Sequence, residues 1–208
     1  SDNQLTGTIP QSYGQLTDLL YFTVYNNYLS GTLPPSLGSL TMLYIFYIDN
    51  NYFTGILPST FNAWKGLVYF GISFNSLTGT ISEEIFSKMS NLYELSLQHN
   101  YFTGSLPNNI STLTSLNYFN IYFNIFTGTL PRDYGNLQGL FFFFIGYNYL
   151  SGIIPSSYSN MISLEQLFLT NNLLTGQLPE YIGDLQYLQF VDTSVNLLTG
   201  TIPGSMAQ

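Results

Sequence analysis

Apolar side chains recur at the same places along the chain about every 24 residues, with short polar stretches between them. Residues 40–58 read LTMLYIFYIDNNYFTGILP, in which Phe46 and Ile48 alternate with residues of the opposite face. Such alternation over a few residues indicates a short β-strand with one buried side. Because the pattern recurs from end to end, it predicts eight complete strands, with partial repeats at both ends.

An asparagine marks the end of each predicted strand and sets the length of the repeat. Seven of the eight intervals between these asparagines are 24 residues, and one is 25. A glycine follows each asparagine after four residues, which suits a turn with a positive φ angle. We expect the amides to form a column of hydrogen bonds to backbone groups that the turns leave unpaired. Asn3 begins the series, and the structural ladder comprises Asn27, Asn51, Asn75, Asn100, Asn124, Asn148, Asn172 and Asn196.

A proline follows the glycine in every repeat but one, and the segment after it suits a 3₁₀ or irregular turn better than a long helix. The 25-residue repeat has Ser82 in place of the proline. Ser82 followed by Glu83 and Glu84 predicts a fuller helical turn there. We therefore interpret the two glutamates as support for a helix N-terminus rather than as a catalytic pair.

The inward positions of the repeat accept Leu, Ile, Val, Phe and Met, as a shared core between stacked repeats requires. Nine of the 17 phenylalanines fall at these positions, and we predict that they are core residues. They are Phe22, Phe46, Phe53, Phe61, Phe70, Phe102, Phe119, Phe126 and Phe143.

The charge balance excludes some classes of partner. Only 7% of the residues are charged, against about 25% in typical soluble domains. The formal net charge is −8, and Lys65, Lys88 and Arg132 are the only lysines and arginines. Without a basic patch, binding to nucleic acid or to an anionic membrane is disfavoured. The longest apolar run, residues 140–145, is too short for a transmembrane segment.

Catalytic and metal-binding chemistry is also disfavoured. The chain has one histidine, His99, and no cysteine, so a Cys–His nucleophile is impossible and a metal-ligand cluster is improbable. The acids predicted on the strands, Asp49, Glu94 and Asp192, stand on different strands too far apart for a paired-carboxylate site. We therefore expect no enzyme activity, no catalytic or metal site and no cofactor.

Residues 16–34 follow the pattern LxxLxxFxVxxNxLSGxLP, and this pattern covers nearly the whole chain. It resembles the plant-type leucine-rich repeat, LxxLxxLxLxxNxLxGxIP. The resemblance implies an α/β-type repeat solenoid, a right-handed superhelix. Its parallel β-sheet would form the concave face, and short 3₁₀ or irregular segments the convex face. Residues 1–208 would be a single domain without the cysteine caps usual in the family, as expected for a segment of a longer solenoid. The resemblance also implies an extracellular or cell-surface location.

Outward positions of the predicted strands are rich in aromatic residues. In the second repeat these positions are 45, 47, 49 and 50, and 13 of the 32 equivalent positions are aromatic. Two interpretations remain open: a binding interface, or aromatic ladders in which neighbouring rings satisfy one another. Glu94 and His99 would add a polar spot. The predicted partner-binding residues are Tyr21, Tyr25, Tyr47, Tyr69, Phe74, Glu94, His99, Tyr118, Tyr122, Phe123, Phe142, Phe144, Tyr147, Phe168 and Phe190.

These features predict a non-catalytic recognition or scaffold module that binds a protein or a neutral glycan, including copies of itself, through a weakly charged aromatic surface. One alternative is a structural subunit of an extracellular fibre or sheet. A further alternative is ice binding, through rows of Ser and Thr on either side of the repeat glycine, although Ile56, Ile153 and Gln177 interrupt one row. The sequon Asn109-Ile110-Ser111 makes Asn109 a glycosylation candidate.

Overall fold

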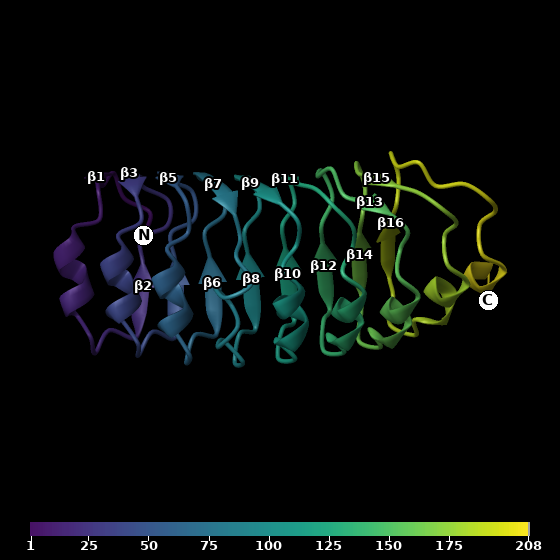
Figure 1. Cartoon of the computed structure of the whole chain (residues 1–208), viewed down its shortest axis with the longest axis horizontal. Helices are drawn as coiled ribbons and strands as arrows, with labels where there is room; N and C mark the ends of the chain where they lie inside the picture. The colour runs from purple at the N-terminus through teal and green to yellow at the C-terminus, as the bar shows by residue number, and fades with distance from the viewer. Residues whose placement is uncertain (208) are drawn as a thin grey trace.

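Eight short parallel strands, one from each repeat, form the sheet that the alternating pattern predicts. The computed structural model describes residues 1–207; Gln208, the last residue of the predicted domain, lies outside the described residues. The strands pair in chain order, each with the strand of the next repeat, and stack along the long axis (Figure 1). They are β2 (Tyr21–Thr23), β4 (Ile45–Tyr47), β6 (Tyr69–Gly71), β8 (Glu94–Ser96), β10 (Tyr118–Asn120), β12 (Phe142–Phe144), β14 (Gln166–Phe168) and β16 (Phe190–Asp192).

The register of this sheet follows the repeat, so equivalent residues lie side by side. Phe22 pairs with Phe46, and Phe119 pairs with Phe143. Their rings stack inside the core with centroids 5.3 and 5.6 Å apart. The extra residue of the 25-residue repeat does not disturb the register, because it is accommodated before Glu94 pairs with Tyr69.

A second set of parallel strands, which the sequence analysis did not predict, lies after the asparagine of each repeat. Six of these strands form one sheet and two form another. The sequence pattern does not indicate them because each contains the repeat glycine or ends within two residues of it, and a glycine whose φ lies between +77° and +89° is typical of a turn. These strands are β1 (Thr6–Gly7), β3 (Tyr28–Thr32), β5 (Tyr52–Gly55), β7 (Ser76–Thr80), β9 (Tyr101–Gly104), β11 (Ile125–Phe126), β13 (Ser151–Gly152) and β15 (Leu173–Leu174).

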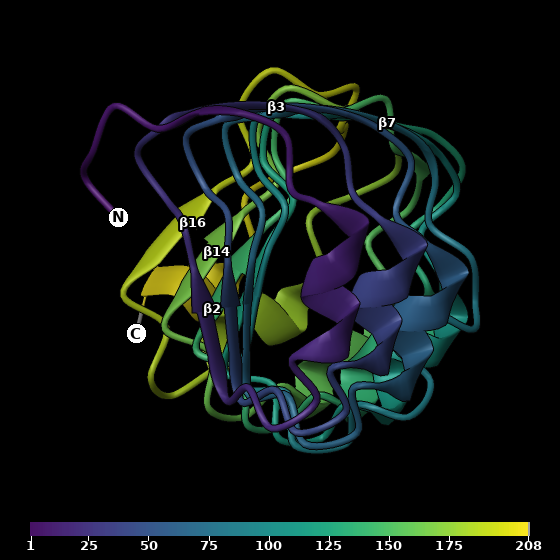
Figure 2. The same cartoon turned by 90° about the vertical axis from the view of Figure 1, so that its left-hand side faces the viewer.

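Short 3₁₀ helices follow the prolines, as predicted, and cover the side of the solenoid opposite the eight-stranded sheet (Figure 2). Viewed down the stack, the second strands cross between these two sides. The helices are η1 (Gln11–Gln15), η2 (Pro35–Ser39), η3 (Ser59–Ala63), η4 (Asn108–Thr112), η5 (Arg132–Asn136), η6 (Ser156–Asn160), η7 (Glu180–Asp184) and η8 (Gly204–Ala207).

The fuller helical turn predicted after Ser82 is wrong. Residues 83–88 form a run of turns, held by separate bonds such as the Ser87 N–H to the Glu84 carbonyl oxygen (3.2 Å). Glu83 does support a helix N-terminus, but that of the next repeat. Its carboxylate accepts the backbone N–H groups of Asn108 and Asn109, at the start of η4, at 2.9 Å each.

The core is continuous along the stack and contains all nine predicted phenylalanines. Three larger side chains, Trp64, Tyr134 and Tyr158, are also fully buried on the 3₁₀ side. Each directs its polar atom to a backbone carbonyl of the preceding repeat; Trp64 Nε1 donates to Leu37 O (3.0 Å), and Tyr134 Oη donates to Pro107 O (2.9 Å). Aromatic residues therefore link neighbouring repeats by polar contacts as well as by packing.

The repeat asparagines form a hydrogen-bonded column in the turn between the two kinds of strand. Asn124 is typical: its Oδ1 accepts the Phe102 N–H (3.0 Å), and its Nδ2 donates to Leu97 O (3.0 Å) and Ile121 O (3.1 Å). The same pattern recurs from Asn51 to Asn172, where the asparagines are at most 8% exposed. Each amide thus joins its own turn to the turn of the preceding repeat.

Candidate functional site

The outward side of the eight-stranded sheet, here called the concave face, carries most of the predicted partner-binding residues. None of the 13 predicted aromatics belongs to the buried core. Five are exposed: Tyr21, Phe74, Phe123, Tyr147 and Phe190. The other eight are half-buried: Tyr25, Tyr47, Tyr69, Tyr118, Tyr122, Phe142, Phe144 and Phe168.

Four of the predicted residues lie beside the concave face rather than on it. Phe74, His99, Phe123 and Tyr147 occupy the turn after the strand, where each has a φ of 51–54°. That left-handed conformation is unfavourable for bulky side chains. Their rings form a continuous stack, with centroids 4.2, 4.4 and 4.0 Å apart in chain order. Sequence reasoning placed them on the sheet because it did not anticipate this backbone turn.

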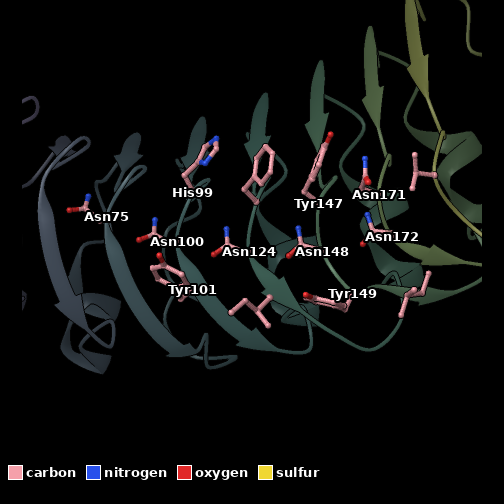
Figure 3. Close-up of a pocket in the computed structure, with 14 residues that line it drawn as sticks. Asn75, His99, Asn100, Tyr101, Asn124, Tyr147, Asn148, Tyr149, Asn171 and Asn172 are labelled. Atoms are coloured by element: carbon pink, nitrogen blue, oxygen red, sulfur yellow. The ribbon is translucent and has the colours of Figure 1, made fainter.

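Three members of the stack, His99, Phe123 and Tyr147, form one wall of a groove between the two kinds of strand (Figure 3). Figure 3 shows His99, Tyr147 and Asn171 along one side, Tyr101 and Tyr149 along the other, and the asparagine column between them. The groove has a volume of about 610 Å³. Since its floor amides already bond the backbone, its free surface is mainly aromatic and aliphatic.

On the concave face itself, rings from three neighbouring strands form a cluster. Tyr118 on β10 contacts Phe142 and Phe144 on β12, with centroids 5.9 and 5.7 Å apart. Phe144 in turn contacts Phe168 on β14 (5.0 Å), edge to face at 80°. The rings therefore do form the cross-strand contacts of a ladder, yet they stay half-exposed and border two hollows of about 660 and 330 Å³.

Two glycines shape this surface by making room for tyrosines of the preceding repeat. A Cβ atom at Gly71 would overlap the Tyr47 ring, and one at Gly146 would overlap the Tyr122 ring. Tyr47 consequently extends across β6 and donates its hydroxyl to Glu94 Oε2 on β8 (2.9 Å). A glycine at an outward strand position was the sequence signal that could have revealed this contact.

Glu94 and His99 do not form the single polar spot that was predicted. Glu94 faces Tyr47 in the larger hollow, whereas His99 lies between the rings of Phe74 and Phe123. Burial lowers the pKa of His99. The larger hollow contains instead a second carboxylate, Asp49, whose Oδ1 accepts the backbone N–H of Ser73 (2.8 Å).

Both carboxylates in the larger hollow are poorly solvated. Burial raises the pKa of Asp49 and of Glu94; hydrogen bonds from Ser73 and Tyr47, respectively, act in the opposite direction. Burial likewise raises the pKa of Tyr118 beside them. Lys65 follows η3, Lys88 lies in the 83–88 turns and Arg132 begins η5, so the cations of the chain are on its opposite side. Carboxyl groups whose pKa is shifted by burial often mark functional sites.

We predict that Glu94→Gln raises the midpoint of thermal unfolding at pH 7. A raised folded-state pKa means that the folded chain binds the proton more tightly than the unfolded chain does. The stability of the wild type therefore falls as pH rises from the ordinary carboxyl pKa through the raised one. Gln keeps an acceptor for the Tyr47 hydroxyl but carries no charge. The difference in unfolding midpoint between the variant and the wild type should shrink below about pH 4, near the ordinary glutamate pKa. A lower midpoint for the variant at pH 7 would contradict this account.

Other repeated side chains lie away from the eight-stranded sheet. Tyr28, Tyr52 and Tyr101 are exposed on the second strands, and Tyr149 is exposed just before β13. Among the Ser and Thr residues before the repeat glycine, the Ser151 hydroxyl donates to Gly128 O (3.1 Å). Asn109 is half-buried in η4, and its Nδ2 donates to the Glu83 carbonyl oxygen (2.9 Å).

Family comparison agrees with this geometry. A model described as "Leucine rich repeat" matches residues 41–102, and a second, "Leucine Rich Repeat", matches residues 18–40 and 163–185. The chain is a leucine-rich repeat protein. A comparison with curated protein sequences found no match. Within residues 1–207, this leucine-rich repeat protein has no helix with the length and apolar character needed to cross a bilayer.

Solved structures of plant receptors resemble this leucine-rich repeat chain over nearly its full length. The plant peptide hormone receptor RGFR1 in complex with RGF2 is 34% identical, with a TM-score of 0.96 over 98% of this chain and 32% of its own. The Arabidopsis receptor kinase HAESA, in complex with the peptide hormone IDA and the co-receptor SERK1, is 32% identical, with a TM-score of 0.96 over 99% of this chain and 34% of its own. The chain thus spans about a third of their length.

A plant ice-binding protein also has a similar structure. It is 26% identical, with a TM-score of 0.80 over 97% of this chain and 73% of its own. Similarity to both kinds of protein shows that the repeat architecture alone does not select one function.

Proposed function

We propose that this chain is a non-catalytic recognition module, built from plant-type repeats and located outside the cell, that binds a peptide or protein segment on its concave face. The observation that carries the proposal is the half-buried aromatic cluster of Tyr118, Phe142, Phe144 and Phe168, which is partly exposed beside two hollows. Exposed aromatic surface of this kind is typical of interfaces. The complexes of RGFR1 and HAESA with peptide hormones support the proposal.

The arrangement of the rings favours a peptide over a neutral glycan. Tyr118 and Phe168 each meet Phe144 edge to face, at 84° and 80°. Rings packed in this way offer edges and gaps rather than the open flat faces on which sugars stack. Uneven hollows between rings suit individual side chains of an extended peptide.

Replacing Phe142 and Phe144 with Ser is expected to weaken peptide binding by about tenfold or more, because both rings lie at the centre of the surface. Peptides would be selected on the immobilised wild-type protein from a displayed library of random dodecapeptides. Their Kd values for both proteins would then be measured by calorimetry. Circular dichroism would check that the variant remains folded.

The matched control replaces Tyr101 and Tyr149 with Ser. These rings are 53% and 55% exposed, Tyr101 on β9 and Tyr149 just before β13, so they supply a similar change of surface away from the concave face. Replacing them should leave the Kd of the selected peptides within about twofold of the wild-type value. The proposal fails if no peptide is selected, or if the control variant loses binding while the Phe142/Phe144 variant retains it. Loss of the folded signal would show instead that Phe142 and Phe144 are structural.

Ice binding is a second candidate, which the outward rows of Ser and Thr on the second strands favour. The structure of the plant ice-binding protein supports it. Against it, the row after the glycine has a packing role. The Cγ2 atoms of Thr8 and Ile56 lie 2.7 and 2.6 Å from where Cβ atoms at Gly31 and Gly79 would be, so an isoleucine packs there as a threonine does. Absence of thermal hysteresis at millimolar protein would exclude strong ice binding.

Self-association into a fibre or sheet is the structural alternative. Light scattering across a concentration series distinguishes it from recognition. A constant monomer mass at high concentration would exclude the fibre, and mass that grows with concentration would support it.

A further inference from the structure

The larger hollow of the concave face combines aromatic walls with negative charge. Its volume is about 660 Å³, and Tyr25, Tyr47, Tyr93 and Tyr118 contribute rings to its lining. Asp49 and Glu94 are the acidic residues that line it, and no lysine, arginine or histidine does so among residues 1–207. The tyrosines come from repeats on both sides of Glu94, so the charge lies within the aromatic surface rather than at its edge.

Hydrogen bonds hold both carboxylates in place, and Glu94 has an oxygen left for a ligand. Glu94 Oε2 accepts the Tyr47 hydroxyl, and Asp49 Oδ1 accepts the Ser73 N–H. These bonds fix the orientation of both groups and leave Glu94 Oε1 to other partners, whereas Asp49 Oδ2 lies close to where a Cβ atom at Gly71 would be. Because the cations of the chain lie on the 3₁₀ side, the neutralising charge must come from another molecule or from solvent. Charge complementarity therefore favours a cationic group in this hollow.

An arginine side chain fits this chemistry better than other cations. Its planar guanidinium donates paired hydrogen bonds to carboxylates and also stacks on aromatic rings. A tyrosine face attracts such a cation at short range. Tyr47 and Tyr118 lie beside Glu94 on the concave face, and Phe142 continues the lining toward the apolar cluster. A lysine ammonium would gain the charge contact without the planar stacking.

We propose that this hollow is a specificity subsite that receives an arginine side chain of the bound peptide, with Glu94 as the acceptor and Asp49 as a second negative charge in the same lining. The proposal rests on the proposed function, since it names a subsite of the same concave face. The neighbouring hollow of about 330 Å³, lined by Phe74, Tyr122, Phe144 and Phe168, would receive an apolar side chain of the same peptide.

The test uses dodecapeptides selected on the wild-type protein, each synthesised with arginine and with the uncharged, nearly isosteric citrulline at the same position. On the wild type, citrulline should weaken Kd by about tenfold or more. For the double variant Glu94→Gln with Asp49→Asn, the Kd values of the arginine and citrulline peptides should differ by less than about threefold. Both substitutions keep an acceptor for the Tyr47 hydroxyl or the Ser73 N–H.

Asp192→Asn is the matched control. Asp192 ends β16 on the same face, and its Oδ1 accepts the Ser194 N–H (2.9 Å), so the substitution removes an equal charge outside the hollow. This control should discriminate arginine from citrulline as the wild type does. Equal loss of discrimination in Asp192→Asn would mean that general electrostatics, not the subsite, selects arginine, and would overturn the proposal.

Two other outcomes separate the subsite from the function. Selected peptides that need Phe142 and Phe144 but contain no arginine, or tolerate citrulline, would overturn the subsite and leave the proposed function standing. Failure to select any peptide that depends on the concave face would overturn both. Concentration-dependent dimerisation that Arg132→Gln abolishes would place a second copy of the chain in the hollow and would also overturn the proposal.

Discussion

Replacing Asn124 with Ala is expected to lower the free energy of unfolding by about 3–5 kcal/mol. The Phe102 N–H would lose its acceptor in a buried turn, and an unpaired buried donor costs about 1–3 kcal/mol. The bonds from Nδ2 to Leu97 O and Ile121 O would also be lost, at about 1 kcal/mol each. Those carbonyls keep bonds from Asn100 and Asn148, which limits the loss. Urea denaturation followed by circular dichroism measures the change.

Asn91→Ala is the control for the ladder substitution. Asn91 is exposed in a turn of the same solenoid, so its replacement should change the unfolding free energy by no more than about 0.5 kcal/mol. Equal effects of the two substitutions would mean that the asparagine column does not hold the repeats together.

Replacing Trp64 with Ala should destabilise the chain by about 3–5 kcal/mol, because it removes the largest fully buried side chain. The indole stacks on Phe61 with centroids 3.9 Å apart and contacts Phe46 at 4.8 Å. Its N–H also bonds Leu37 O, which retains a second bond from the Leu40 N–H. Most of the loss therefore comes from the cavity. Chemical denaturation followed by circular dichroism measures it, since Trp64 is the only tryptophan.

Trp64→Phe separates packing from the hydrogen bond. Phenylalanine keeps an aromatic ring between Phe61 and Phe46 but has no N–H donor. Trp64→Phe should therefore lower the free energy of unfolding by less than half as much as Trp64→Ala does. An effect of Trp64→Phe as large as that of Trp64→Ala would show that the bond to the preceding repeat matters more than the ring.

The repeat period was sufficient to predict the eight-stranded sheet and its core. Once the asparagines set the frame, Phe46 and Phe143 could be placed inside and Phe142 and Phe144 outside, because side chains alternate along a strand. The 3₁₀ segments followed from the prolines. The second strands did not follow, because glycines such as Gly31 at φ +80° read as turn residues.

The details of the candidate site were less predictable because they depend on contacts between repeats. Phe74 and Tyr147 adopt left-handed backbone conformations that few bulky residues adopt, so no propensity placed them in the stack. The Tyr47–Glu94 bond spans two strands, and it depends on the space that Gly71 leaves. The sequence predicted which residues face outward but not how those residues meet.

The most direct test of the central claim, that the concave face is the binding surface, is an NMR titration of protein with ¹³C-labelled phenylalanine and tyrosine rings. The titrant is a peptide selected on the wild type. We predict shifts for Phe142, Phe144, Phe168 and Tyr118, with the core ring of Phe143 and the exposed rings of Tyr101 and Tyr149 unchanged. Shifts confined to Tyr101 and Tyr149, or to no ring at all at saturating peptide, would contradict the account.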